Sequence, residues 1–69
     1  MENKERIEKL SSLVQLDIDA VHAYQEAIDK IDEPIVREHL IRYREDHDRH
    51  IQELSNDIRE LGGTPPEYS

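Results

Sequence analysis

The sequence contains no cysteine, no tryptophan and no phenylalanine, and only two glycines and three prolines among its 69 residues. Without cysteine, no disulfide can brace the fold, and a chain this short buries little apolar core of its own. Small domains of this kind are commonly stabilised by a metal ion or by a partner chain. The lack of cysteine also fits a reducing compartment, so we expect a cytoplasmic protein.

Long apolar runs are missing as well. No stretch approaches the ~20 apolar residues that a membrane-spanning helix needs, and the opening residues Met-Glu-Asn-Lys-Glu-Arg lack the apolar core of a signal peptide. We therefore expect no membrane partner. The net charge of -8 repels the phosphate backbone, which argues against nucleic-acid binding, and it draws cations towards the surface.

Glycine and proline are absent from residues 3–31, which predicts a first helix over about this range. Apolar residues recur there at alternating steps of three and four, the spacing of a seam that faces another helix. This first seam consists of Ile7, Leu10, Val14, Asp17, Val21, Tyr24, Ile28 and Ile31. A second, narrower stripe, which predicts contact with more than one neighbouring helix, consists of Leu13, Leu16, Ala20 and Ala27.

A second helix is predicted over about 33–61. Pro34 is acceptable only in the first turn of a helix, so Asp32 or Glu33 is the expected N-cap. Gly62-Gly63 supply a left-handed end, and the two following prolines leave residues 64–69 as a short tail. The second seam consists of Val36, Leu40, Tyr43, His47, His50, Leu54 and Leu61, with Ile51 and Ile58 beside it. Since the connection is short, the two helices should pack as an antiparallel all-α hairpin over residues 1–63.

Three polar residues interrupt the two seams, namely Asp17 in the first and His47 and His50 in the second. In an antiparallel hairpin that turns at 32–33, these three residues come level with one another. A carboxylate inside a core must find a proton, a cation or hydrogen-bond donors. Two imidazoles and a carboxylate on neighbouring helices are a typical ligand set for a divalent transition metal. The sequence therefore predicts a metal site at these residues.

Three further residues lie close to the predicted site. Asp46 precedes His50 by four residues, so it could orient that ring. Tyr24 and Tyr43 lie on the seams, either as core rings whose hydroxyls need a partner or in a supporting redox role.

A metal-free alternative stays open. A buried hydrogen bond between aspartate and histidine can hold a hairpin in register by itself. The chain would then be a helical module that dimerises or docks on another helix. His22 and His39 are expected on the surface in either case.

The arrangement resembles the ferritin-like superfamily. In the first helix, the carboxylate of Asp17 is followed by Ala20 and Tyr24; in the second, His47-Asp48-Arg49-His50 is followed by Leu54. Short two-helix members, such as the encapsulated ferritin-like proteins, and rubrerythrin-type domains carry a similar pattern. The resemblance spans residues 10–63. It departs from the family where His47 replaces a glutamate and where the first-helix ligand is the shorter aspartate.

The resemblance implies a four-helix bundle, formed here by a homodimer or a larger homo-oligomer. It also implies iron as the metal, and oxidation of ferrous iron or chemistry on oxygen or peroxide as the activity. The two departures leave fewer bridging carboxylates than a di-iron centre has. One chain alone offers the ligand set of mononuclear non-heme iron, and zinc or manganese are alternative metals for it.

Overall fold

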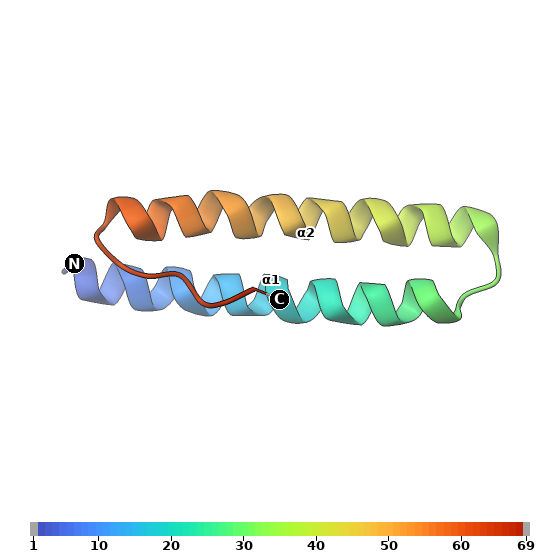
Figure 1. Cartoon of the computed structure of the whole chain (residues 1–69), viewed down its shortest axis with the longest axis horizontal. Coiled ribbons are helices and arrows are strands. Elements are labelled where there is room, and N and C mark those ends of the chain that lie inside the picture. The colour runs from blue at the N-terminus through green and yellow to red at the C-terminus, as the bar shows by residue number, and fades with distance from the viewer. Residues whose placement is uncertain (1, 69) are drawn as a thin grey trace.

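Two helices of nearly equal length form the fold of this computed structural model, which describes residues 2–68 (Figure 1). Helix α1 spans Asn3–Lys30 and helix α2 spans Pro34–Glu60. The connection has three residues, so the helices lie antiparallel over their whole length. No strand occurs within residues 2–68. The predicted all-α hairpin is confirmed. In the same range, neither helix is long and apolar enough to cross a membrane.

Two neighbouring residues determine where α2 begins. Glu33 is the N-cap, and its side chain accepts a hydrogen bond from the backbone N–H of Val36 at 2.7 Å. That bond satisfies one of the amide donors that a helix leaves unpaired at its first turn. Pro34 occupies the first helical position, where its missing N–H costs nothing.

The end of α2 is a two-glycine turn. Gly62 has a φ of +87°, a conformation that side chains with a Cβ rarely adopt. The N–H of Gly62 donates to the Arg59 carbonyl at 3.0 Å, and that of Gly63 donates to the Ile58 carbonyl at 2.9 Å. This pair of bonds is a Schellman motif, and it turns the chain back towards α1.

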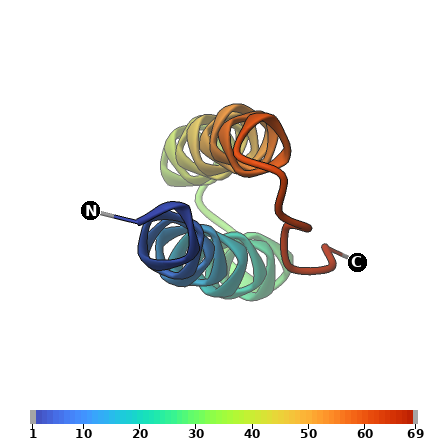
Figure 2. The ribbon, with the colours of Figure 1, turned by 90° about the vertical axis from the view of Figure 1, so that its left-hand side faces the viewer.

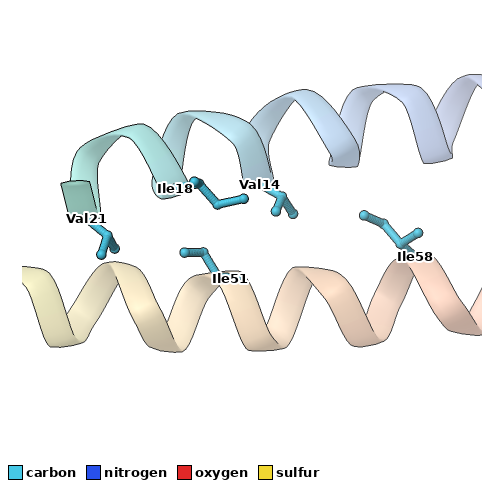
Figure 3. Packing of buried hydrophobic residues seen from close by; sticks show 5 residues of the cluster. All are labelled: Val14, Ile18, Val21, Ile51 and Ile58. Carbon is cyan, nitrogen blue, oxygen red and sulfur yellow. The ribbon is translucent and has the colours of Figure 1, made fainter. Parts of the chain in front are cut away.

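The core is a single line of branched apolar side chains between the helices (Figure 3). Its fully enclosed members, between 0% and 6% exposed, are Val14, Ile18, Val21, Ile51 and Ile58. Ile7, Leu10 and Leu54 pack against this line and are half-buried.

The centre of the core is rotated from the predicted seams. Ile18 belongs to the core although it lay outside the first seam, and Ile51 and Ile58 are buried although they lay beside the second. Tyr43, on the second seam, is 49% exposed. The reason is geometric: a straight helix has 3.6 residues per turn, so it drifts away from a strict seven-residue repeat.

The residues after α2 run back along one side of the hairpin (Figure 2). We call residues 64–68 the C-terminal strap; Ser69 of the predicted tail lies outside the described residues. A pocket of mixed polarity separates the strap from one face of α2 and is lined there by Ile51, Gln52, Ser55 and Arg59. At the far end of the strap, the Tyr68 hydroxyl donates a hydrogen bond to the Asp48 carboxylate. The sequence predicts a short tail here, and the structure adds that this tail packs back along the hairpin.

Substitution of Gly63 by alanine should destabilise the hairpin, because the added Cβ would lie 2.8 Å from Ile7 Cγ2 and 3.0 Å from Ile58 Cγ2. Overpacking of this kind costs about 1–3 kcal/mol, which thermal unfolding followed by circular dichroism would measure. Gly62→Asn is the comparison for backbone strain alone, since nothing lies within 4 Å of that position and its cost comes from the left-handed conformation, which asparagine tolerates better than most side chains. A Gly63→Ala variant as stable as the wild type would contradict the close packing of Gly63.

The strap should detach in alkaline solution. Burial, together with the hydrogen bond to the Asp48 carboxylate, raises the pKa of Tyr68 from 10.0 to about 12, against a smaller opposing effect of the Arg44 charge. The contribution of the neutral hydroxyl is therefore complete below pH 10 and is lost as the pH rises through about 12. The phenolate absorbance of the wild-type chain minus that of Tyr68→Phe should titrate near pH 12. A midpoint near the ordinary value would show that the strap does not hold this side chain.

Candidate metal centre

The structure brings Asp17 of α1 together with His47 and His50 of α2. Nδ1 of His47 lies 2.6 Å from Oδ1 of Asp17, and Nδ1 of His50 lies 3.9 Å from the same oxygen. One potential ligand atom from each of the three side chains lies within 4.8 Å of the other two. This is the set of residues that the two seams predicted.

The register of the hairpin produces this convergence. Val14 and Ile18 on one side and Ile51 on the other are buried in one cluster, as Figure 3 shows. Asp17 lies between the first two along α1, and His47 lies one turn before Ile51 along α2. Interlocked aliphatic side chains therefore set the height at which the carboxylate and the imidazole meet.

Exposure increases steadily across the cluster. The side chain of Asp17 is 14% exposed, that of His47 is 30% exposed and that of His50 is 51% exposed. The sequence suggested three groups inside a core, whereas the hairpin leaves them increasingly open to solvent at one side of the contact between the helices. Two helices can enclose one line of side chains between them, so residues beside that line stay open to solvent.

Aromatic rings support one of the imidazoles. The Tyr24 ring is stacked on His47 with centroids 5.5 Å apart and an interplanar angle of 28°. Tyr43 packs on Tyr24 at 5.9 Å in a tilted arrangement. The His50 ring meets His47 edge-on at 6.0 Å. These contacts restrict the rotation of the His47 ring, while the more exposed His50 ring has room to move.

The sequence also indicated Asp46, His22 and His39, and none of these is part of the cluster. The Asp46 carboxylate accepts a hydrogen bond from Arg49 at 2.9 Å, so its expected role in orienting His50 stays a prediction. His22 and His39 are exposed, as predicted.

A carboxylate and two imidazoles in this arrangement can bind a divalent cation after small movements of their donor atoms. Donor atoms at about 2.1 Å from one ion are separated by about 3 Å when adjacent and about 4 Å when opposite. The widest separation within the cluster is 4.8 Å, so a displacement of about 1 Å brings the three donors into range. The half-exposed His50 side chain is free to make that movement.

The fold and the cluster together define a small all-α protein with a candidate metal-ligand set between its two helices. The chain belongs to the family described as a domain of unknown function (DUF2383), whose sequence model matches residues 5–69. The comparisons with curated proteins and with solved structures returned no match.

Removal of the Asp17 carboxylate should destabilise the metal-free hairpin, because His47 loses its partner in a partly enclosed position. We expect Asp17→Ala to lower the free energy of unfolding by about 1 kcal/mol in buffer containing EDTA. Asp19→Ala removes the same charge from an exposed position on α1 and should cost less than about 0.5 kcal/mol. Denaturant unfolding measures both values. Indistinguishable variants would show that the Asp17–His47 hydrogen bond contributes nothing to the stability of the hairpin.

Proposed function

We propose that this protein binds a divalent transition metal ion through Asp17, His47 and His50. The observation that carries the proposal is the approach of one donor atom from each side chain to within 4.8 Å of the others, across two helices. Each of the three side chains, taken alone, is common in proteins that bind no metal. A carboxylate beside two imidazoles on a strongly acidic protein favours a bound cation.

Iron is the metal that we propose. Two histidines and one carboxylate on one side of an ion are the ligand set of mononuclear non-heme iron, and they leave coordination positions open. The resemblance of the two helices to the ferritin-like superfamily points the same way. On this basis we propose oxidation of ferrous iron, or a reaction with oxygen or peroxide, as the activity of the site.

The chain's own residues have definite parts in this proposal. Asp17 would supply the negative charge, and the stacked Tyr24 ring would hold His47 in position. His50, the most exposed of the three side chains, would complete the set by rotating towards the other two. Iron would supply the redox chemistry.

A second function is favoured by one specific observation. His47 and Asp17 are already hydrogen-bonded at 2.6 Å, which pairs both groups without any cation. The cluster would then lock the register of a helical interaction module. The two proposals differ in metal content, which the next experiment measures.

Protein purified without chelators, and then loaded with ferrous iron in the absence of oxygen, should retain metal in a fixed ratio to the chain. His50→Ala should weaken metal affinity at least about tenfold, because loss of a ligand exceeds the effect of losing a supporting contact. Saturating metal should also raise the unfolding temperature of the wild type, as any ligand specific to the folded state does. Elemental analysis and thermal unfolding provide the readouts.

His39→Ala is the matched control for that experiment, since it removes an exposed histidine from the same helix. It should bind metal like the wild type. On admission of air, the wild type and this control should oxidise bound ferrous iron faster than His50→Ala does. A wild-type chain that retains no metal and gains no thermal stability would refute the metal function and favour the register lock.

A further inference from the structure

The pocket between the C-terminal strap and α2 shares no lining residue with the Asp17–His47–His50 cluster. Its volume is about 410 Å³, which lies within the range of pockets that hold small organic ligands. One wall is a face of α2, and residues 64–68 of the strap form the other wall. The pocket is therefore a second candidate site, separate from the metal centre.

Both ends of the strap are anchored. At its start, the N–H of Gly63 is bonded to the Ile58 carbonyl. At its end, the Tyr68 hydroxyl is bonded to the Asp48 carboxylate. Two consecutive prolines lie between these anchors and restrict the backbone further. Since the wall is already held in place, a ligand would bind without the cost of ordering it.

Ser55 supplies a hydroxyl that the fold does not use. The residue is 5% exposed and lines the pocket, yet its side chain has no hydrogen-bond partner within residues 2–68. Every fully enclosed side-chain nitrogen or oxygen in this range does have a partner, so the Ser55 hydroxyl is not sealed in the core. It opens instead into the pocket that Ser55 lines. A polar group held this deep and left unpaired is available to a ligand.

The pocket carries one charge of each sign. Since the strap runs back along α2 (Figure 1), Arg59 lies near its start and Glu67 lies near its end, towards Gln52. The Arg59 guanidinium donates to the Asn56 side-chain oxygen at 3.1 Å, which uses one of its five N–H groups and leaves the others for a ligand. A ligand that spans the pocket would meet a cation at one end and an anion at the other.

The surface between the two charges is partly apolar and partly able to form hydrogen bonds. Ile51 is 2% exposed, and together with the proline rings it offers an apolar surface. Gln52, Ser55 and Thr64 add side chains that can each donate and accept a hydrogen bond. A peptide bond requires this combination, because it presents one N–H donor and one carbonyl acceptor.

We propose that the strap pocket binds a dipeptide with free ends, its carboxylate at Arg59 and its ammonium group at Glu67. The length agrees. Asn56, beside the Arg59 guanidinium, is four residues from Gln52, or about 6 Å along the helix, and an extended dipeptide spans about 7 Å. The charge agrees as well, because a zwitterion has no net charge for a protein of net charge -8 to repel.

The dipeptide Ala-Leu is the probe, titrated in buffer with EDTA so that metal binding is excluded. Magnetic resonance titration should shift the amide signals of Gln52, Ser55 and Thr64, with a dissociation constant of about 1 mM or lower. Two blocked forms are the ligand controls. N-acetylation removes the ammonium group and C-terminal amidation removes the carboxylate, so each form should bind at least about tenfold more weakly.

Charge variants test the direction of binding. Arg59→Gln should weaken Ala-Leu at least about tenfold and no longer distinguish it from the amidated form. Glu67→Gln should do the same for the acetylated form. Both side chains are exposed, so the fold tolerates these changes, which circular dichroism verifies. Arg42→Gln and Glu45→Gln, at exposed positions of α2 outside the pocket, are the matched controls and should bind like the wild type.

Ser55→Ala separates binding from folding. Its hydroxyl has no partner to lose, and alanine is the better helix former, so the free energy of unfolding should not fall. The affinity for Ala-Leu should nevertheless drop severalfold, because one hydrogen bond to the ligand is lost.

Three results would overturn the proposal. The first is a wild-type protein that shows no saturable binding of Ala-Leu up to about 10 mM, tenfold above the expected constant. The second is equal affinity for Ala-Leu and both blocked forms. The third is a set of signal changes centred on His47 and His50, which would place the dipeptide at the metal cluster. None of these results bears on the metal function, which is measured without peptide.

Discussion

Interlocking of aliphatic side chains between the two helices is the constraint on which the rest of this structure depends. Val14 and Ile18 pack with Ile51, and this contact fixes how far one helix can slide along the other. A slip of one turn would displace Asp17 from His47 by about 5 Å, beyond the reach of a hydrogen bond or of a shared cation. The polar cluster is therefore a consequence of apolar packing, and its hydrogen bond reinforces a register that the core already sets.

The partial exposure of the cluster decides what it can do. A carboxylate and two imidazoles fully enclosed in a core would be costly without a cation, whereas groups that reach solvent can persist without one. Asp17 is well shielded and His50 is half-exposed, so the site is accessible from one side. Accessibility suits a metal that is taken up, that reacts with a small molecule or that is completed by another chain. A structural ion enclosed in a core needs no such access to solvent.

The two sides of the hairpin differ in polarity and in exposure, although both helices contribute residues to each side. The side under the strap has buried Ser55 and a tyrosine hydroxyl bonded to Asp48, so the chain satisfies its own polar groups there. The opposite side exposes Leu13 and Tyr43 to solvent, each within about one helical turn of a candidate ligand. A chain with so few enclosed side chains gains stability from covering either side, and the strap does so on one side at the cost of ordering a few residues.

The sequence by itself determined the two helices, their ends and the level at which the polar residues meet. These features depend on local rules: the absence of glycine and proline within each helix, the proline and double glycine that bound the second, and the near-constant rise per residue that makes heights predictable. The same rules indicate Asp17, His47 and His50 as candidate ligands. Only the tertiary structure decided that Ile18, Ile51 and Ile58 form the centre of the core, because the small drift between 3.6 and 3.5 residues per turn accumulates along helices of this length. It also decided that the tail returns as a strap and that the Asp17–His47–His50 cluster lies partly exposed at one side of the contact between the helices. Those outcomes depend on contacts between residues far apart in the chain, such as Gly63 with Ile7 and Tyr68 with Asp48, and no periodicity along one helix records them.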